Sequence, residues 1–166
     1  QDKDLSIKFF DEILTVDHRM EIHTDLEVLV QKILSVDSMD SRSKLTALNS
    51  IFSAECKKRG TPVHSLAFDN DKKLVRIEVP FSPTDLSIDN EVIDKTLKLI
   101  RYGIVGVLLY KFHYETFVIT ETKPEGMDFI SVKVKSKDLE AYAKEEIGLY
   151  DILNDCNIYL TGQKID

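Results

Sequence analysis

The sequence predicts an α+β fold, in which an N-terminal helical bundle accompanies a mainly antiparallel β-sheet flanked by helices. In residues 1–60, apolar side chains recur at the helical period of about 3.6 residues. After Gly60 they alternate with charged side chains, as in strands that keep one face in water. We therefore expect a helical segment at residues 1–60 and an α+β sheet domain at residues 61–166, packed as one continuous globular unit.

Three helices are expected in the first segment. The first covers residues 5–16, whose apolar side chains share one face. The second opens at Thr24, because Glu27 stands three residues later and the pair has the pattern of a capping box. The third is the stretch SRSKLTALNSIFSAECKKRG, where basic residues suit the negative helix end and Gly60 supplies a left-handed stop.

The second segment begins with a hairpin and a helix. Residues 62–68 and 74–79 are β-prone runs on either side of the turn sequence DNDKK, which predicts two paired strands. The stretch IDNEVIDKTLKLIRYG then returns to the helical period, with Ser87 or Asp89 as its cap and Gly103 as its stop.

Three further strands are expected at residues 104–112, 116–122 and 129–134, with KPEG as the turn between the last two. The run at residues 104–110 is apolar on both faces, which is typical of a central strand covered on each side. A helix from Ser136, a helical turn at residues 149–153 and a closing strand at residues 157–161 complete the expected fold.

Composition disfavours several classes of protein. The formal net charge of −7 opposes non-specific binding to nucleic acid or to anionic lipid. The longest apolar run, residues 104–110, is far shorter than the roughly 20 residues of a bilayer-spanning helix. No signal-peptide pattern is visible, so we expect a soluble, cytoplasmic protein. The chain starts at Gln1 without a methionine, which leaves a removed signal peptide or a larger parent chain open.

No motif identifies a cofactor or a metal site. Two glycines in GIVG lack the further residues of a P-loop or a dinucleotide fingerprint. His18 and His23 lie five residues apart, whereas two ligands on one helix face are three or four apart. We therefore predict no metal and no cofactor. Cys56 and Cys156 are expected to be reduced, buried thiols.

Two groups of residues are candidates for function. His113 stands in YKFHYET with Tyr110 and Glu115, and a histidine beside a carboxylate can act as a general base. The region from Asp11 to Asp40 holds eight acidic and two basic residues, including Asp17, Glu21 and Asp25, and such a segment can steer a basic protein partner.

The stretch from Val107 to Asp155 resembles small bacterial domains of unknown function, in which a β-meander is followed by a helix and a short segment, here Gly148, Asp151 and Leu153. The resemblance implies a β-meander and no assigned chemistry.

The leading hypothesis is a non-enzymatic protein-binding, regulatory or accessory module of a bacterial system. The alternative is a small hydrolase or ligand-binding enzyme with a site near His113. Nucleic-acid binding would need the basic residues after Gly60 to gather on one face.

Overall fold

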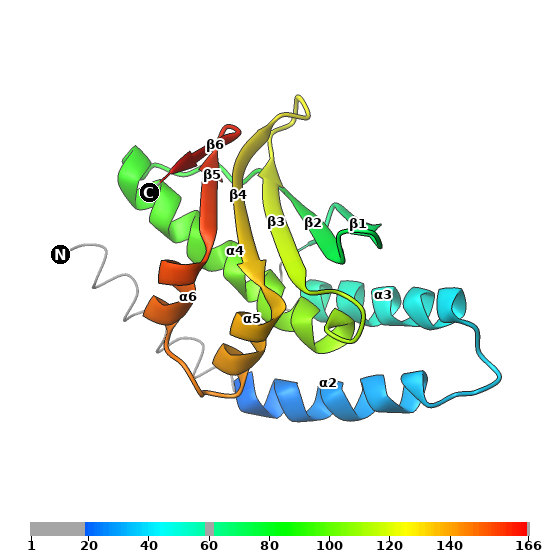
Figure 1. Cartoon of the computed structure of the whole chain (residues 1–166). Helices are drawn as coiled ribbons and strands as arrows, with labels where there is room; N and C mark the ends of the chain where they lie inside the picture. Colours follow the sequence, from blue (N-terminus) through cyan, green and yellow to red (C-terminus); the bar gives the residue numbers. More distant parts are fainter. Residues whose placement is uncertain (1–18, 59–61, 166) are drawn as a thin grey trace.

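The computed structural model describes residues 19–58 and 62–165, of which residues 19–25 are described by their backbone alone (Figure 1). In these residues the helices are α2 (Arg19–Leu34), α3 (Ser41–Lys58), α4 (Ile88–Tyr110), α5 (Ser136–Ala143) and α6 (Leu149–Asp155). The strands are β1 (Ser65–Asp69), β2 (Leu74–Pro80), β3 (Thr116–Thr122), β4 (Asp128–Lys135), β5 (Asn157–Leu160) and β6 (Gln163–Ile165).

The six strands form one sheet, and their spatial order β1-β2-β3-β4-β5-β6 is also their order along the chain. Neighbouring strands are antiparallel, except that β2 and β3 run parallel, with Ile77 opposite Ile119. Parallel strands need a long crossover, and α4 provides it. The predicted α+β fold with a mainly antiparallel sheet flanked by helices is confirmed.

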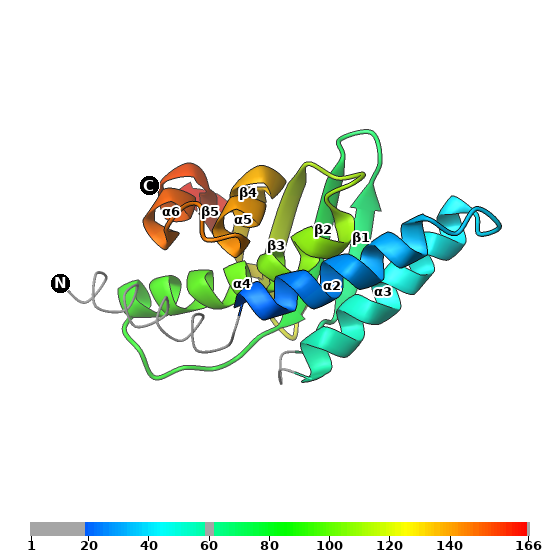
Figure 2. The same cartoon turned by 90° about the horizontal axis from the view of Figure 1, so that it is seen from below.

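Helices α2, α3 and α4 lie on one side of the sheet, with α4 next to the strands and α2 beside α3 (Figures 1 and 2). Alternate strand residues such as Ile77, Ile119 and Val132 point to this side and are fully buried. Val30 of α2 and Phe52 of α3 belong to the same buried cluster. The N-terminal helices and the sheet therefore share one hydrophobic core.

The other sheet face is polar. Arg76, Thr120, Ser131 and Lys133 occupy the alternate positions of the central strands. Thr120 and Ser131 are buried beneath their neighbours and share a hydrogen bond of 2.8 Å between their hydroxyl oxygens. In the described part of the chain no helix lies on this face (Figure 1).

The predicted strand at residues 104–112 is wrong, because this stretch forms the second half of α4 and the turn that follows it. Its residues are apolar on all sides because the sheet, α2, α3 and α5 surround the helix. Gly103 does not end the helix. A Cβ there would lie 3.1 Å from Leu139, and one at Gly106 would lie 3.0 Å from Phe117, so both glycines allow close packing.

The start of α2 was also predicted wrongly. The helix begins at Arg19, so Thr24 lies inside it and cannot be its N-cap. At α3 the cap is Asp40, whose Oδ1 accepts a hydrogen bond of 2.7 Å from the Ser43 backbone N–H. Ser87 does hold the N-cap position of α4, although its side chain makes no capping hydrogen bond. The helix predicted at residues 5–16 and the stop at Gly60 lie outside the described residues.

The remaining predicted elements match the structure within a few residues. They are α3, the β1-β2 hairpin, β3, β4, α5, α6 and β5. The short strand β6 was not predicted. Both cysteines are free, as expected, but only Cys56 is buried, whereas Cys156 is half-buried.

Candidate functional site

The three residues of the enzymatic hypothesis do not meet around one cavity. Tyr110 is buried in the core, where its hydroxyl donates a hydrogen bond of 2.7 Å to Asn49 Oδ1. Burial raises the pKa of this phenol far above its usual range, so it stays protonated. His113 is exposed in the turn after α4 and contacts the ring of Tyr114.

Glu115 points elsewhere and forms an exposed ion pair of 3.9 Å with Lys73. It also lines a polar cleft of about 620 Å³ together with Lys111, Lys135 and Glu140. Lys111 bridges this cleft, because its Nζ lies 3.3 Å from Glu27 and 3.1 Å from Glu140. The charge of Lys111 is thus balanced by two neighbouring carboxylates.

The acidic candidates and the histidine pair lie mostly beyond the described side chains. Asp17 and His18 are outside the described residues. Glu21, His23 and Asp25 belong to α2, where only the backbone is described, and the spacing of Glu21 and Asp25 places them one helical turn apart. Where side chains are described, no group of three or more His, Cys, Asp or Glu residues is placed to hold a metal ion.

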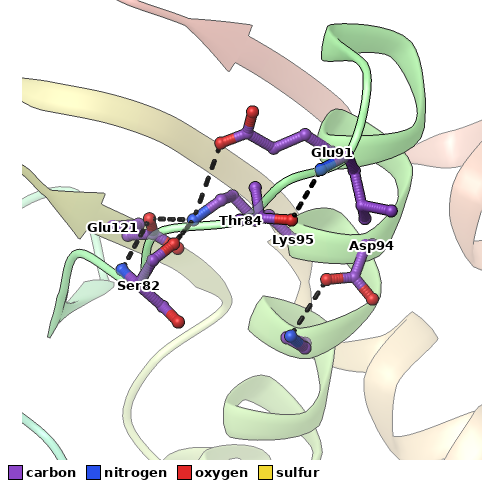
Figure 3. A network of polar contacts seen from close by, with 8 residues as sticks. Ser82, Thr84, Glu91, Asp94, Lys95 and Glu121 are labelled. Atoms are coloured by element: carbon purple, nitrogen blue, oxygen red, sulfur yellow. Dashed lines mark hydrogen bonds and ion pairs between the residues drawn. The ribbon is translucent and has the colours of Figure 1, made fainter.

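A buried ionic network, which the sequence analysis missed, surrounds Lys95 of α4 (Figure 3). The side chains of Lys95 and Glu121 are only 3% and 6% exposed and form an ion pair. Lys95 Nζ also donates a hydrogen bond of 2.5 Å to the Ser82 carbonyl oxygen and lies 3.9 Å from Glu91 Oε1. Ser82 N–H in turn donates to Glu121 Oε1 at 3.3 Å.

Two aromatic rings enclose the same ammonium group. Lys95 Nζ lies 4.6 Å from the centroid of the Phe81 ring and 5.4 Å from that of Phe129. An ammonium group has three donors. Two of them are used by the Ser82 carbonyl oxygen and Glu121 Oε1, and Glu91 adds an ion-pair contact. The network therefore fastens the segment after β2 to α4 and to the end of β3.

An apolar groove of about 640 Å³ lies between the first half of α4 and the elements α6, β5 and β6. Its side chains are mostly aliphatic, and none is aromatic. They comprise Ile88, Val92, Ile93 and Leu97 of α4, together with Leu153, Ile158, Leu160 and Ile165. Ile88 is 54% exposed, and the neighbouring Leu86 is also exposed, so the rim of the groove presents apolar surface to water.

Polar residues also line this groove, among them Asp89, Asn154, Asn157 and Lys164. Thr96 is buried, and its Oγ1 has no hydrogen-bond partner in the described structure. Leaving a buried hydroxyl unpaired is unfavourable. Cys156 also lines the groove, and burial raises the pKa of its thiol to about 11, which makes it a poor nucleophile near neutral pH. The aliphatic walls of the groove are suited to binding an apolar group.

Comparison with protein families, with curated proteins and with solved structures finds no match for this chain. No helix in the described ranges is both long enough and apolar enough to cross a membrane.

Sequence reasoning missed both the groove and the lysine network, although one signal was present. Lys95 follows Val92 by three residues and precedes Leu99 by four, so it lies on an apolar stripe of its helix. A lysine at such a position is a candidate for burial with a carboxylate. The groove had no local signal, because it joins residues from α4 with residues near the end of the sequence.

Proposed function

We propose that this chain is a non-enzymatic protein-binding module with a regulatory or accessory role, and that the apolar groove is its docking site. The observation that carries the proposal is Ile88, a largely exposed aliphatic side chain that lines the groove. Exposed apolar surface beside a cavity is typical of interaction sites. The bacterial setting rests on the resemblance of the C-terminal part alone.

The electrostatic arrangement supports a binding role over a catalytic one. Lys95 is surrounded by its own acceptors, and the positions of His113, Tyr110 and Glu115 lend no support to the enzymatic alternative. The groove itself offers aliphatic walls beside the polar residues Asp89, Asn154, Asn157 and Lys164. The aliphatic walls fit the apolar side chains of a partner.

Site-specific photocrosslinking in the host cell tests the proposal. A photoreactive amino acid at position 88 should crosslink to one protein, which mass spectrometry identifies. The matched control is position 112, because Phe112 is also an exposed apolar side chain. It lies in the turn after α4, at the opposite end of that helix from Ile88 and outside the acidic segment.

Binding of the purified partner must then be lost in Ile88→Asp, which places a charge on the rim. The proposal fails if position 88 yields no adduct, crosslinks only to lipid or small molecules, or reacts only with residues 1–18 of its own chain. It also fails if both positions capture the same proteins, because such capture would be non-specific.

We further propose that the acidic segment between Asp11 and Asp40 steers a basic partner toward this module. Reversing Asp17, Glu21 and Asp25 to lysine should slow association and flatten its dependence on salt, because exposed charges act mainly on encounter. Stopped-flow kinetics with the identified partner at low and high salt measures this effect. Equal association rates for the parent and the reversed protein would leave the segment as ordinary solvated surface.

A further inference from the structure

The groove lies at the edge of the sheet, where α4 is only partly covered. In the described residues β6 is the last strand in the sheet order, and it contains only Gln163–Ile165. Figure 1 shows the first turns of α4 extending past β6. Ile88, in the first of these turns, is largely exposed. The space above the start of α4 therefore lies where a further strand of the sheet would run.

The backbone of β6 is placed to accept such a strand. The two residues between β5 and β6, Thr161 and Gly162, both have positive φ angles, as in a tight two-residue hairpin. In such a hairpin the pairs Leu160–Gln163 and Ile158–Ile165 carry the hydrogen bonds, whereas the intervening pair does not. The N–H and C=O of Lys164 consequently point away from β5, toward the open edge.

The side chains around this edge define the chemistry of the added segment. Ile158 and Ile165 are cross-strand neighbours, and both line the groove. Alternate residues of a strand added to β6 would point to the same side, above Ile88 and Val92. Aliphatic residues fit there, because eight of the lining residues are aliphatic and none is aromatic, although Asp89 and Lys164 also line the groove.

We infer that the partner binds through an extended segment that pairs with the open edge of β6 and inserts alternate aliphatic side chains into the groove. This inference rests on the proposed function and specifies its docking mode. Backbone pairing supplies part of the affinity, and the alternate side chains supply the specificity. The pairing also covers the edge of the sheet at β6, where the strand has only three residues.

A defined peptide probe tests this mode directly. The probe is a short synthetic peptide with Val or Ile at alternate positions and Thr or Lys between them. A peptide of the same composition with its aliphatic residues contiguous is the control. Amide hydrogen exchange of the isotope-labelled protein should show that the first peptide protects the Lys164 N–H by about tenfold or more. The second peptide should leave that N–H unprotected.

Two substitutions separate backbone pairing from side-chain effects. Lys164→Pro removes the outward N–H, and proline is tolerated on an edge strand when its nitrogen faces outward. It should weaken peptide binding by about tenfold, the cost of a lost hydrogen bond. Lys164→Ala keeps the N–H and should bind within about threefold of the parent protein. If the proline variant fails to fold, hydrogen exchange of the Lys164 N–H in the parent protein tests the strand pairing instead.

The outcomes distinguish this inference from the proposed function. Strand pairing is overturned if the proline and alanine variants bind the peptide equally. It is also overturned if the Lys164 N–H stays unprotected while the peptide occupies the groove. Neither outcome affects the photocrosslinking result. Absence of peptide binding at millimolar concentration also overturns it. If light scattering shows a dimer for the parent protein and a monomer for Lys164→Pro, the edge of β6 is instead a self-association surface. Failure of photocrosslinking at position 88 removes both proposals.

Discussion

Replacing Lys95 by methionine should destabilise the protein strongly, because the substitution leaves Glu121 buried without its counterion. Methionine keeps most of the length and apolar character of the lysine stem, so the change mainly removes the charge. Glu121 would retain only the Ser82 N–H, at 3.3 Å, as a donor. Glu91 would also lose its ion-pair partner.

The expected cost follows from the burial of this pair. Removing one partner of a buried ion pair costs about 3–5 kcal/mol, whereas replacing both partners by apolar groups is often close to neutral. A loss of that size is a large fraction of the total stability of about 5–15 kcal/mol that is usual for a domain. Lys95→Met combined with Glu121→Leu should therefore recover most of the stability lost by the single variant.

Urea denaturation at neutral pH measures these differences, with Lys98→Met as the matched control. Lys98 is on the same helix and pairs with Asp94 at 2.9 Å, but both side chains are exposed. Its substitution should cost no more than about 1 kcal/mol. The reasoning would be refuted if Lys95→Met were as stable as Lys98→Met, or if the double variant were less stable than Lys95→Met alone.

Three other predictions concern stability and reactivity. The Ser43 backbone N–H lowers the pKa of Asp40 below 3.8, so this cap stabilises α3 above that pH and its contribution is lost as the pH falls through the lowered pKa. Asp40→Ala should accordingly lower the melting temperature at neutral pH more than at acidic pH. Asp40→Asn should lower the melting temperature less than Asp40→Ala does. An equal loss for Asp40→Ala at neutral and acidic pH would contradict this role of the cap. Leu109→Asp should unfold the domain, because an unpaired buried carboxylate costs several kcal/mol, and an unchanged melting temperature would show that the helix is exposed. Alkylation of Cys156 should be slow near neutral pH and accelerate toward its pKa of about 11, whereas the rate of a free thiol would contradict burial.

Elements whose pattern matched a single period were predictable from the sequence. β4 alternates apolar and polar residues, and α3 keeps one apolar face, so both were placed within two residues of their bounds. The stretch at residues 104–112 failed because a fully surrounded helix and a fully covered strand are both apolar throughout. Gly103 then favoured the wrong choice, since glycine can end a helix as well as permit close packing inside it.

The candidate site was less predictable because tertiary packing creates it. The groove forms where α4 crosses beneath the end of the sheet. The sequence-based prediction treated the second half of α4 as a strand, so it did not contain this crossover. β6 contains only three residues, too few for any periodic pattern. His113 and Glu115 are close in sequence yet have different neighbours. His113 contacts the ring of Tyr114, whereas Glu115 forms an ion pair with Lys73.

The sheet order has a consequence for how the chain assembles. Because each strand pairs only with the strands that precede and follow it, the sheet can grow in one direction as the polypeptide leaves the ribosome. Two pairings must wait for helices to be made: that of β2 with β3 requires the whole of α4, and that of β4 with β5 requires α5 and α6. Until α4 and β3 are made, the hairpin of β1 and β2 has no third strand, and it is marginal by itself. The crossover through α4 is the longer of the two, so it is the longer interval in which the growing sheet lacks its next strand.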